Sequence, residues 1–188
     1  MSGSPPPIPS VETERLLLRA IQPEDLDKYH SRLFADPEVM RFLPGGRPIP
    51  RERLDGLVER SHHHWRRYGY GVWVVLDRAP GEIIGQCGLR FVEEAEETEV
   101  LYALARNYWG RGLATEGARA ALEFGFDNAG LERIVGFADR GNVASCKVME
   151  HLGMENHGPI RIFEMDALRY SIDLDRFREH ERQTSSLG

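Results

Sequence analysis

The sequence predicts an α/β fold: a mixed, mostly antiparallel sheet of about seven strands, with helices on both of its faces. Two observations support this prediction. Apolar runs of strand length are separated by longer segments with helix start and stop signals, and three of the runs follow one another directly, as in an antiparallel meander. The chain of 188 residues fits one domain with a substantial core.

Capping signals locate the helices along the chain. A proline followed by two acids at 23–25 is typical of a first helical turn, and Gly69 follows a second helix. Asn142 and Gly153 fit the N-cap and the C′ position of a later one. The expected helices span 22–34, 50–67, the segment from the loop at 107–112 to about 128, and 142–153. The expected strands span 15–19, 71–76, 83–91, 98–104, 133–138, 154–162 and 167–172.

Both ends of the chain differ in composition from the rest. Residues 1–10 are rich in proline and serine, which predicts a disordered tail, and residues 179–188 are predicted to be a flexible polar tail. We therefore expect a single domain over residues 11–178, with the chemistry confined to it.

The composition argues against several classes of protein. The net charge of −6 disfavours a nucleic-acid or anionic-membrane partner, because both require basic patches. The sequence shows no run of about 18 apolar residues and no export signal at its start, which predicts a cytoplasmic protein. Cys87 and Cys146 are too few for a disulfide framework, and the adjacent His62, His63 and His64 point to different sides of a helix, so no metal is expected.

The segment Asn-Tyr-Trp-Gly-Arg-Gly-Leu-Ala-Thr-Glu at 107–116 lies between an apolar strand and a helix. Its glycines allow a sharp turn, and a first helical turn leaves N–H donors unpaired, so the loop either binds phosphate or is only a turn. A dinucleotide-binding loop would need glycine at Thr115 and an acid at the end of the next strand, whereas Glu132 stands at its start. A Walker loop would need a Gly-Lys-Ser/Thr sequence. Both of these alternatives are excluded.

Four separated segments follow one another in an order that is typical of one family. They are Thr-Glu-Arg-Leu-Leu-Leu-Arg at 13–19, the glycine loop at 108–116, Asn-Val-Ala-Ser at 142–145 with Leu-Gly-Met at 152–154, and the last strand around Tyr170. Together they resemble the acetyl-CoA-dependent N-acetyltransferases of the GNAT superfamily, in particular the RimJ/RimL-like branch. The resemblance covers about residues 11 to 175, and it identifies the domain at 11–178 as an N-acetyltransferase domain.

The resemblance implies a binding site for acetyl-CoA. In this family the loop holds the pyrophosphate mainly through backbone N–H groups, and Asn107 here replaces the usual Gln or Arg. The strand before the loop is expected to splay from the next strand, so that the pantetheine arm pairs with its backbone, where an N–H polarises the thioester carbonyl. The implied cofactor-binding residues are Leu101, Tyr102, Ala103, Leu104, Asn107, Trp109, Gly110, Arg111, Gly112, Leu113, Ala114, Thr115, Asn142 and Ser145.

Acetyl transfer to an amine requires a base for the amine proton and an acid for the leaving thiolate. Met149 occupies the position at which many relatives have a tyrosine acid, and the serine used by the branch falls on Ser145, which otherwise bonds the cofactor or its own helix. The resemblance favours Glu99 as the base. Strand alternation puts Glu99 on one face with Leu101, but the acidic run at 93–99 also fits a solvated turn or an attractor for a cationic amine.

The acceptor side of the site has one sequence candidate, Trp65, although an aromatic residue at a helix end is more often part of a core. The predicted reaction is direct transfer of acetyl from acetyl-CoA to a primary amine in a ternary complex. The amine belongs to a protein N-terminus or to a small molecule, and the acidic run favours a cationic one. A non-catalytic acyl-CoA sensor is the alternative, and homodimers are common in this family.

Overall fold

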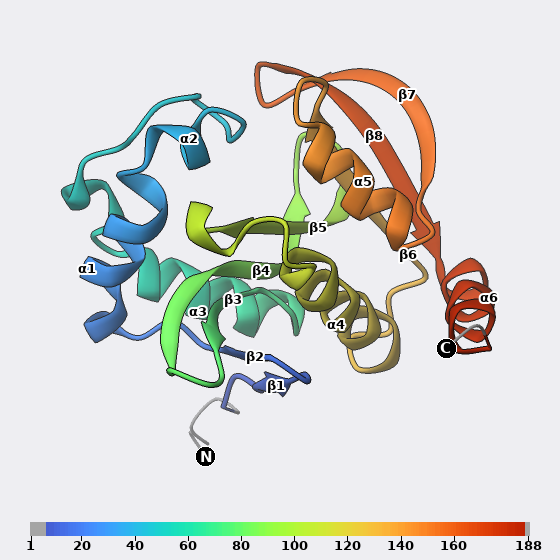
Figure 1. Cartoon of the computed structure of the whole chain (residues 1–188), viewed down its shortest axis with the longest axis horizontal. Coiled ribbons are helices and arrows are strands. Elements are labelled where there is room, and N and C mark those ends of the chain that lie inside the picture. Colours follow the sequence, from blue (N-terminus) through green and yellow to red (C-terminus); the bar gives the residue numbers. More distant parts are fainter. Residues whose placement is uncertain (1–6, 187–188) are drawn as a thin grey trace.

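A computed structural model describes residues 7–186 and contains one eight-stranded sheet (Figure 1). Its strands are β1 (Val11–Glu12), β2 (Leu16–Arg19), β3 (Val72–Asp77), β4 (Glu82–Val92), β5 (Glu97–Leu104), β6 (Arg133–Asp139), β7 (Glu155–Ile162) and β8 (Met165–Asp173). The order in the sheet is β1-β2-β3-β4-β5-β6-β8-β7, and only β5 and β6 pair in parallel. The mixed, mostly antiparallel sheet is confirmed. The additional strand is β1, whose two residues are too few for a sequence pattern.

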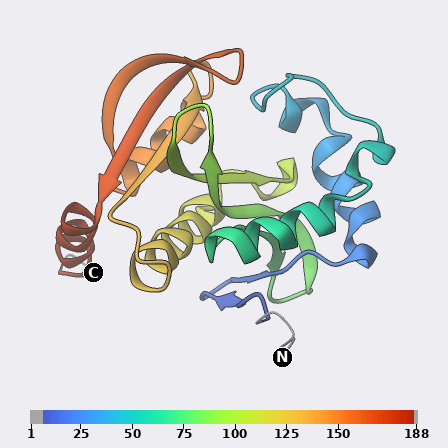
Figure 2. The same ribbon diagram turned by 180° about the vertical axis from the view of Figure 1, so that it is seen from behind.

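Helices cover both faces of the sheet, as predicted (Figures 1 and 2). They are α1 (Leu26–Tyr29), α2 (Pro37–Met40), α3 (Leu57–Tyr68), α4 (Leu113–Asp127), α5 (Val143–His151) and α6 (Leu174–Ser185). Helix α4 packs against β2, β4 and β5 over the main core, which includes Val75. The neighbouring Val74 points to the opposite face, where it joins Leu33 and Leu54 in a second cluster that also includes residues of α1 and α2.

Two of the predicted helices are shorter and more irregular than expected. The predicted helix at 50–67 is divided at Gly56, where φ is +75°, into a 3-10 turn (Arg51–Leu54) and α3. The predicted helix at 22–34 contains α1 between a 3-10 turn and a wider helical turn (His30–Phe34). These breaks matter for the site, because they let the chain between residues 21 and 64 wrap around one side of the sheet.

The sheet opens between β5 and β6. The two strands pair at a single position, Glu99 with Val135, and diverge beyond it. Within residues 7–186, the second half of β5, from Leu101 to Leu104, therefore has no strand partner on its β6 side. This is the splay that the resemblance implied, and it lies in the middle of the sheet beside the N-terminal ends of α4 and α5 (Figure 1).

Both ends of the described chain are more ordered than predicted. Residues 1–6 and 187–188 lie outside the described residues, but Ile8 packs against the core and the Trp73 indole donates a hydrogen bond of 2.7 Å to the carbonyl of Pro9. The expected flexible tail at 179–188 is largely helical, because α6 continues to Ser185 and is anchored by Phe177 against Phe126. The polar composition after Arg178 concealed this anchoring. None of the helices between residues 7 and 186 has the length and apolar character needed to cross a bilayer.

Candidate active site

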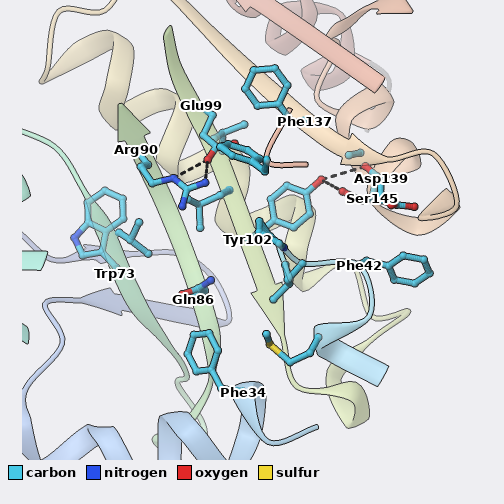
Figure 3. Close-up of a pocket in the computed structure, with 18 of the residues that line it drawn as sticks. Phe34, Phe42, Trp73, Gln86, Arg90, Glu99, Tyr102, Phe137, Asp139 and Ser145 are labelled. Atoms are coloured by element: carbon cyan, nitrogen blue, oxygen red, sulfur yellow. Dashed lines mark hydrogen bonds and ion pairs between the residues drawn. The ribbon is translucent and has the colours of Figure 1, made fainter. Parts of the chain in front are cut away.

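The splay between β5 and β6 leads into a cavity of about 560 Å³ (Figure 3). Its walls come from the central strands β3 to β6, from the irregular chain between residues 21 and 49, from α3, from α5 and from the β7–β8 hairpin. Cavities of this size hold small molecules. The cavity is therefore the candidate site, and the predicted residues can be placed relative to it.

The glycine loop has the geometry of an anion cradle. Gly110 and Gly112 have φ values of +70° and +75°, and α4 begins immediately afterwards at Leu113. Among the described residues, the N–H groups of residues 110–115 have no hydrogen-bond partner; the first N–H of the helix that is bonded is that of Glu116. A Cβ atom added at Gly110 would meet no other atom of the described chain within 4 Å, so this face of the loop is open. Six successive free donors at the positive end of a helix dipole are suited to phosphate.

The first turn of α4 is tied to the N-terminal strand through Glu116. Its carboxylate accepts hydrogen bonds from Thr13 Oγ1 at 2.6 Å, from the Arg15 N–H at 2.8 Å and from Arg15 Nε at 2.7 Å. Burial alone would raise the pKa of Glu116, but these hydrogen bonds outweigh it and hold the pKa below its usual value. Arg15 also donates to the carbonyl of Arg111 at 2.9 Å. The segment at 13–15 therefore fixes the loop from outside the cavity.

The remaining loop residues lie at the surface of the cradle. The Trp109 side chain is 45% exposed, and its indole donates a hydrogen bond of 2.7 Å to the Leu104 carbonyl, which joins the loop to the end of β5. Arg111 places its guanidinium 5.1 Å from the centre of the Tyr108 ring. Asn107 is exposed in the turn before the loop, and Ala114 and Thr115 are half-buried in the first turn of α4.

The predicted pantetheine strand borders the cavity at its centre. Leu101 and Tyr102 line the cavity, whereas the side chains of Ala103 and Leu104 are buried in the two core clusters. Ala103 and Leu104 lie on opposite faces of the strand, as alternation predicts, whereas the cavity at the splay is lined by successive residues from both faces. The part of the β5 backbone that faces the splay is free of a partner strand, as pairing with an extended ligand would require.

A hydrogen-bonded group of three residues lies where α5 meets β5 (Figure 3). The Asn142 side chain caps α5 by accepting from the Ser145 N–H at 3.1 Å. The Ser145 hydroxyl lies 2.9 Å from the Tyr102 hydroxyl, which also donates to the Ser145 carbonyl at 3.1 Å. Burial raises the pKa of Tyr102 despite this contact. The position of Ser145 beside a phenol was not visible in the sequence, because Tyr102 and Ser145 lie on separate elements.

Glu99 faces the cavity as a buried, paired carboxylate. It is 3% exposed, and Arg90 on the neighbouring strand β4 donates to its Oε1, with Nε at 2.8 Å and a second contact from Nη2. Burial raises the pKa of Glu99, although the charge and hydrogen bonds of Arg90 act in the opposite direction. Within the described residues, its Oε2 accepts no hydrogen bond. Glu99 is thus distinct from the solvated acids at 93–96, while Glu97 pairs with Arg169.

The structure places Trp65 in the core instead of the cavity. Its ring is 5% exposed and packs 4.9 Å from Trp73 and 5.7 Å from Phe124, on the face of the sheet covered by α4. Trp65 therefore does not fit the predicted substrate role, because α3 turns its neighbour His64 toward the cavity and Trp65 away from it. Met149 is buried beside Gly136, and it also borders the cavity.

One further side of the cavity is formed by residues that the sequence did not reveal. Aromatic and sulfur-containing side chains from three separate segments line it, namely Phe34, Met40, Phe42, Phe137, Phe163 and Met165. No group of three His, Cys, Asp or Glu side chains within residues 7–186 is arranged to hold a metal ion. His62 and His64 are instead bonded to the backbone, to the carbonyls of Ile21 and Tyr70 respectively.

Relatives of known sequence share most of the domain. The chain is 34% identical over 151 residues to the uncharacterized protein YkkB of Bacillus subtilis, covering 79% of this chain and 87% of that protein. It is 30% identical over 160 residues to the FsC-acetyl coenzyme A-N(2)-transacetylase of Aspergillus fumigatus, covering 78% of this chain and 65% of that protein.

The same fold occurs in solved structures, and a family model matches the sequence. The structure of Mycobacterium smegmatis RimJ in complex with CoA-disulfide has a TM-score of 0.75 at 19% identity, over 91% of this chain and 88% of that one. Residues 15–155 match the family model described as the acetyltransferase (GNAT) domain, which includes the glycine loop, the splayed strands and α5. The protein is an acetyltransferase, and the chain belongs to the GNAT family.

Proposed function

We propose that this acetyltransferase transfers the acetyl group of acetyl-CoA to a primary amine, by direct attack in a ternary complex. One observation carries the proposal. The six N–H groups of the glycine loop, which have no partner within residues 7–186, follow β5 in the chain, and the open edge of β5 borders a cavity that contains both a buried carboxylate and a hydroxyl pair. Anion binding, an extended-chain edge and an acid–base pair are the three features that acetyl transfer from this donor requires.

The residues present fit acetyl-CoA. The N–H groups at 110–115 would hold its pyrophosphate, the backbone from Leu101 to Leu104 would pair with the pantetheine arm, and Asn142 with Ser145 would border the arm from α5. When bound, acetyl-CoA supplies an acyl group on a good leaving thiolate. The chain itself then has to orient the amine and move two protons.

Glu99 is the base in this proposal. Burial raises its pKa, so its carboxylate holds a proton more strongly than an exposed one and can take it from the ammonium form of the acceptor, directly or through water. Arg90 binds Oε1 and leaves Oε2 directed to other partners. Ser145 is the acid: its hydroxyl, 2.9 Å from that of Tyr102, gives a proton to the departing sulfur and takes one from the phenol, which recovers a proton from water.

The finer family position also belongs to this proposal. We assign the protein to the RimJ/RimL-like branch because the Thr-Glu-Arg segment at 13–15 braces the glycine loop through Glu116, and because Ser145 follows the helix cap at Asn142. The acceptor is then a protein N-terminus or an amine-bearing small molecule.

Thiol release from acetyl-CoA in the presence of a panel of primary amines tests the proposal. We expect amine-dependent release that falls about 100-fold or more in kcat for Glu99→Gln and for Ser145→Ala. Glu123→Gln is the control, because partial desolvation also raises the pKa of Glu123 but this exposed residue lies on α4 outside the cavity. CoA binding without release for any amine would instead identify an acyl-CoA sensor, which is the alternative function.

A further inference from the structure

We call the side of the cavity lined by Phe34, Met40, Phe42, Phe137, Phe163 and Met165 the acceptor side. Its side chains restrict which amines can bind. We infer that the acceptor is a primary amine attached to a compact apolar group, such as an aromatic ring or a branched aliphatic chain, and not a polyamine or other polycation. The inference rests on the proposed function, since it concerns the acceptor of the same site. It also replaces the expectation of a cationic acceptor that the acidic run had suggested.

The walls around the acceptor position are apolar. Phe34, Met40 and Phe42 come from the irregular chain before α3, Phe137 from β6, and Phe163 and Met165 from the β7–β8 hairpin. Phe137 and Phe163 meet edge to face, with their ring centres 5.9 Å apart. Figure 3 shows Phe34, Phe42 and Phe137 around the same space as Glu99 and Tyr102. An apolar group attached to the amine would bury its surface against these rings.

The charges at the cavity are balanced. Two carboxylates line it, Glu99 and Asp139, and two guanidinium groups, Arg60 and Arg90. Arg90 is bonded to Glu99, and its Cζ also lies 5.2 Å from the centre of the Phe163 ring. One ammonium group can approach Glu99 and lose its proton there, but a second one would be buried among aromatic rings without an excess of negative charge.

Most polar groups of the wall are already paired. Tyr29 donates to Gln86, and the Asp139 Oδ1 accepts from the Gly141 N–H at 2.8 Å. The two ring nitrogens of His64 contact the Tyr70 carbonyl and the Phe91 N–H. A hydroxyl-rich acceptor would have to break such pairs or leave its own groups unpaired, which costs binding energy. The acidic residues Glu93, Glu94 and Glu96 are exposed on the β4–β5 turn and line no part of the cavity.

Matched amines test the inference by two readouts. Binding of 2-phenylethylamine and of 1,4-diaminobutane to the CoA-loaded protein is measured by calorimetry, and thiol release from acetyl-CoA is measured with the same amines. The peptides Phe-Ala-Ala-Ala and Lys-Ala-Ala-Ala form a second pair, which distinguishes a peptide N-terminus from a free amine. We expect the aromatic member of at least one pair to be preferred by about tenfold or more, because a buried phenyl group contributes more than a solvated ammonium.

A variant pair locates the preference in the cavity. Phe137→Ala should remove most of the preference for the aromatic amine, whereas Phe91→Ala, a half-buried strand phenylalanine outside the cavity, should retain it. Equal or tighter binding of the cationic member in both pairs, or a preference unchanged in Phe137→Ala, would overturn the inference. If the aromatic amine binds preferentially and no amine releases thiol, the inference stands and the proposed transfer reaction fails, so the two failures are distinguishable.

Discussion

The proposed binding regions for the cofactor and for the acceptor are built from different parts of the chain. The proposed cofactor region consists of backbone: the N–H groups at 110–115, which have no partner among the described residues, and the open edge of β5 lie within one short stretch of chain. The acceptor side consists of side chains, which come from the segment before α3, from β6 and from the β7–β8 hairpin. Backbone recognition depends on local conformation, so it tolerates changes of most side chains. Recognition by side chains depends on long-range packing, so single substitutions can change the acceptor.

The largest effect is expected for substitutions of Trp65, which test whether this residue belongs to the core or to the acceptor side. Because Trp65 packs between Trp73 and Phe124, Trp65→Ala should lower the free energy of unfolding by about 3–5 kcal/mol. Denaturant unfolding measures this loss. The milder variant Trp65→Phe keeps the fold testable and should leave the KM for the amine unchanged. If the KM for the amine rises about tenfold in Trp65→Phe while CoA binding is intact, Trp65 contributes to acceptor binding after all.

The cofactor side is tested at Gly110. In Gly110→Val a β-branched side chain must adopt φ near +70° and would lie on the open face of the cradle. We expect the Kd for CoA to rise by about 10- to 100-fold, measured by calorimetry. Gly81→Val is the control, because Gly81 has φ of +69°, is equally open and lies in the β3–β4 turn. Equal losses of CoA affinity in both variants would mean that strain, and not the cradle, is responsible.

The same division explains what the sequence could predict. The strands, the turn at the glycine loop and the cap at Asn142 depend on local signals, and they were predicted within a few residues, whereas the splay was expected only from the family resemblance. Strand alternation grouped Glu99 with Leu101 but left open whether that face meets the cavity, and its partner Arg90 was not foreseen, because their pairing depends on the register of β4 and β5. The acceptor walls could not be predicted, since they form only when distant segments meet. Trp65 was misplaced for a related reason: the sequence did not reveal which face of α3 meets the core.

A substitution of Glu116, whose contacts with Thr13 and Arg15 brace the glycine loop, should have a smaller effect on stability and CoA binding. Glu116→Gln would weaken the bonds from Thr13 and Arg15, which is expected to lower the free energy of unfolding by about 1–2 kcal/mol and to raise the Kd for CoA by about three- to tenfold.

The folded-state pKa of Glu116 is lowered, so the contribution of Glu116 to stability is fully present above the unfolded pKa of about 4.3 and is lost as the pH falls below it. Thermal unfolding at pH 7 and pH 4 measures the loss of stability and its pH dependence, and calorimetry measures the Kd for CoA. The exposed Glu132→Gln is the control; an identical pH dependence in the two variants would contradict the brace.

The smallest effect is expected at His64, on the acceptor side. Its Nδ1–H donates to the Tyr70 carbonyl at 3.0 Å while Nε2 accepts from the Phe91 N–H at 3.2 Å, an arrangement that requires the neutral ring. Burial, together with the positive charges of Arg90 and Arg67, lowers the pKa of His64.

Protonation of His64 in the folded state would remove the bond from Phe91. Because the unfolded chain binds this proton more readily, stability is retained above the unfolded pKa of about 6.5 and declines as the pH falls below it, by about 1 kcal/mol. His64→Gln should reduce the loss measured by thermal unfolding between pH 7.5 and pH 5.5. The exposed His63→Gln should leave it unchanged. A pH dependence that is the same in both variants would show that the acceptor side responds to acid through some other group, and that the neutral ring of His64 does not hold β4 against α3.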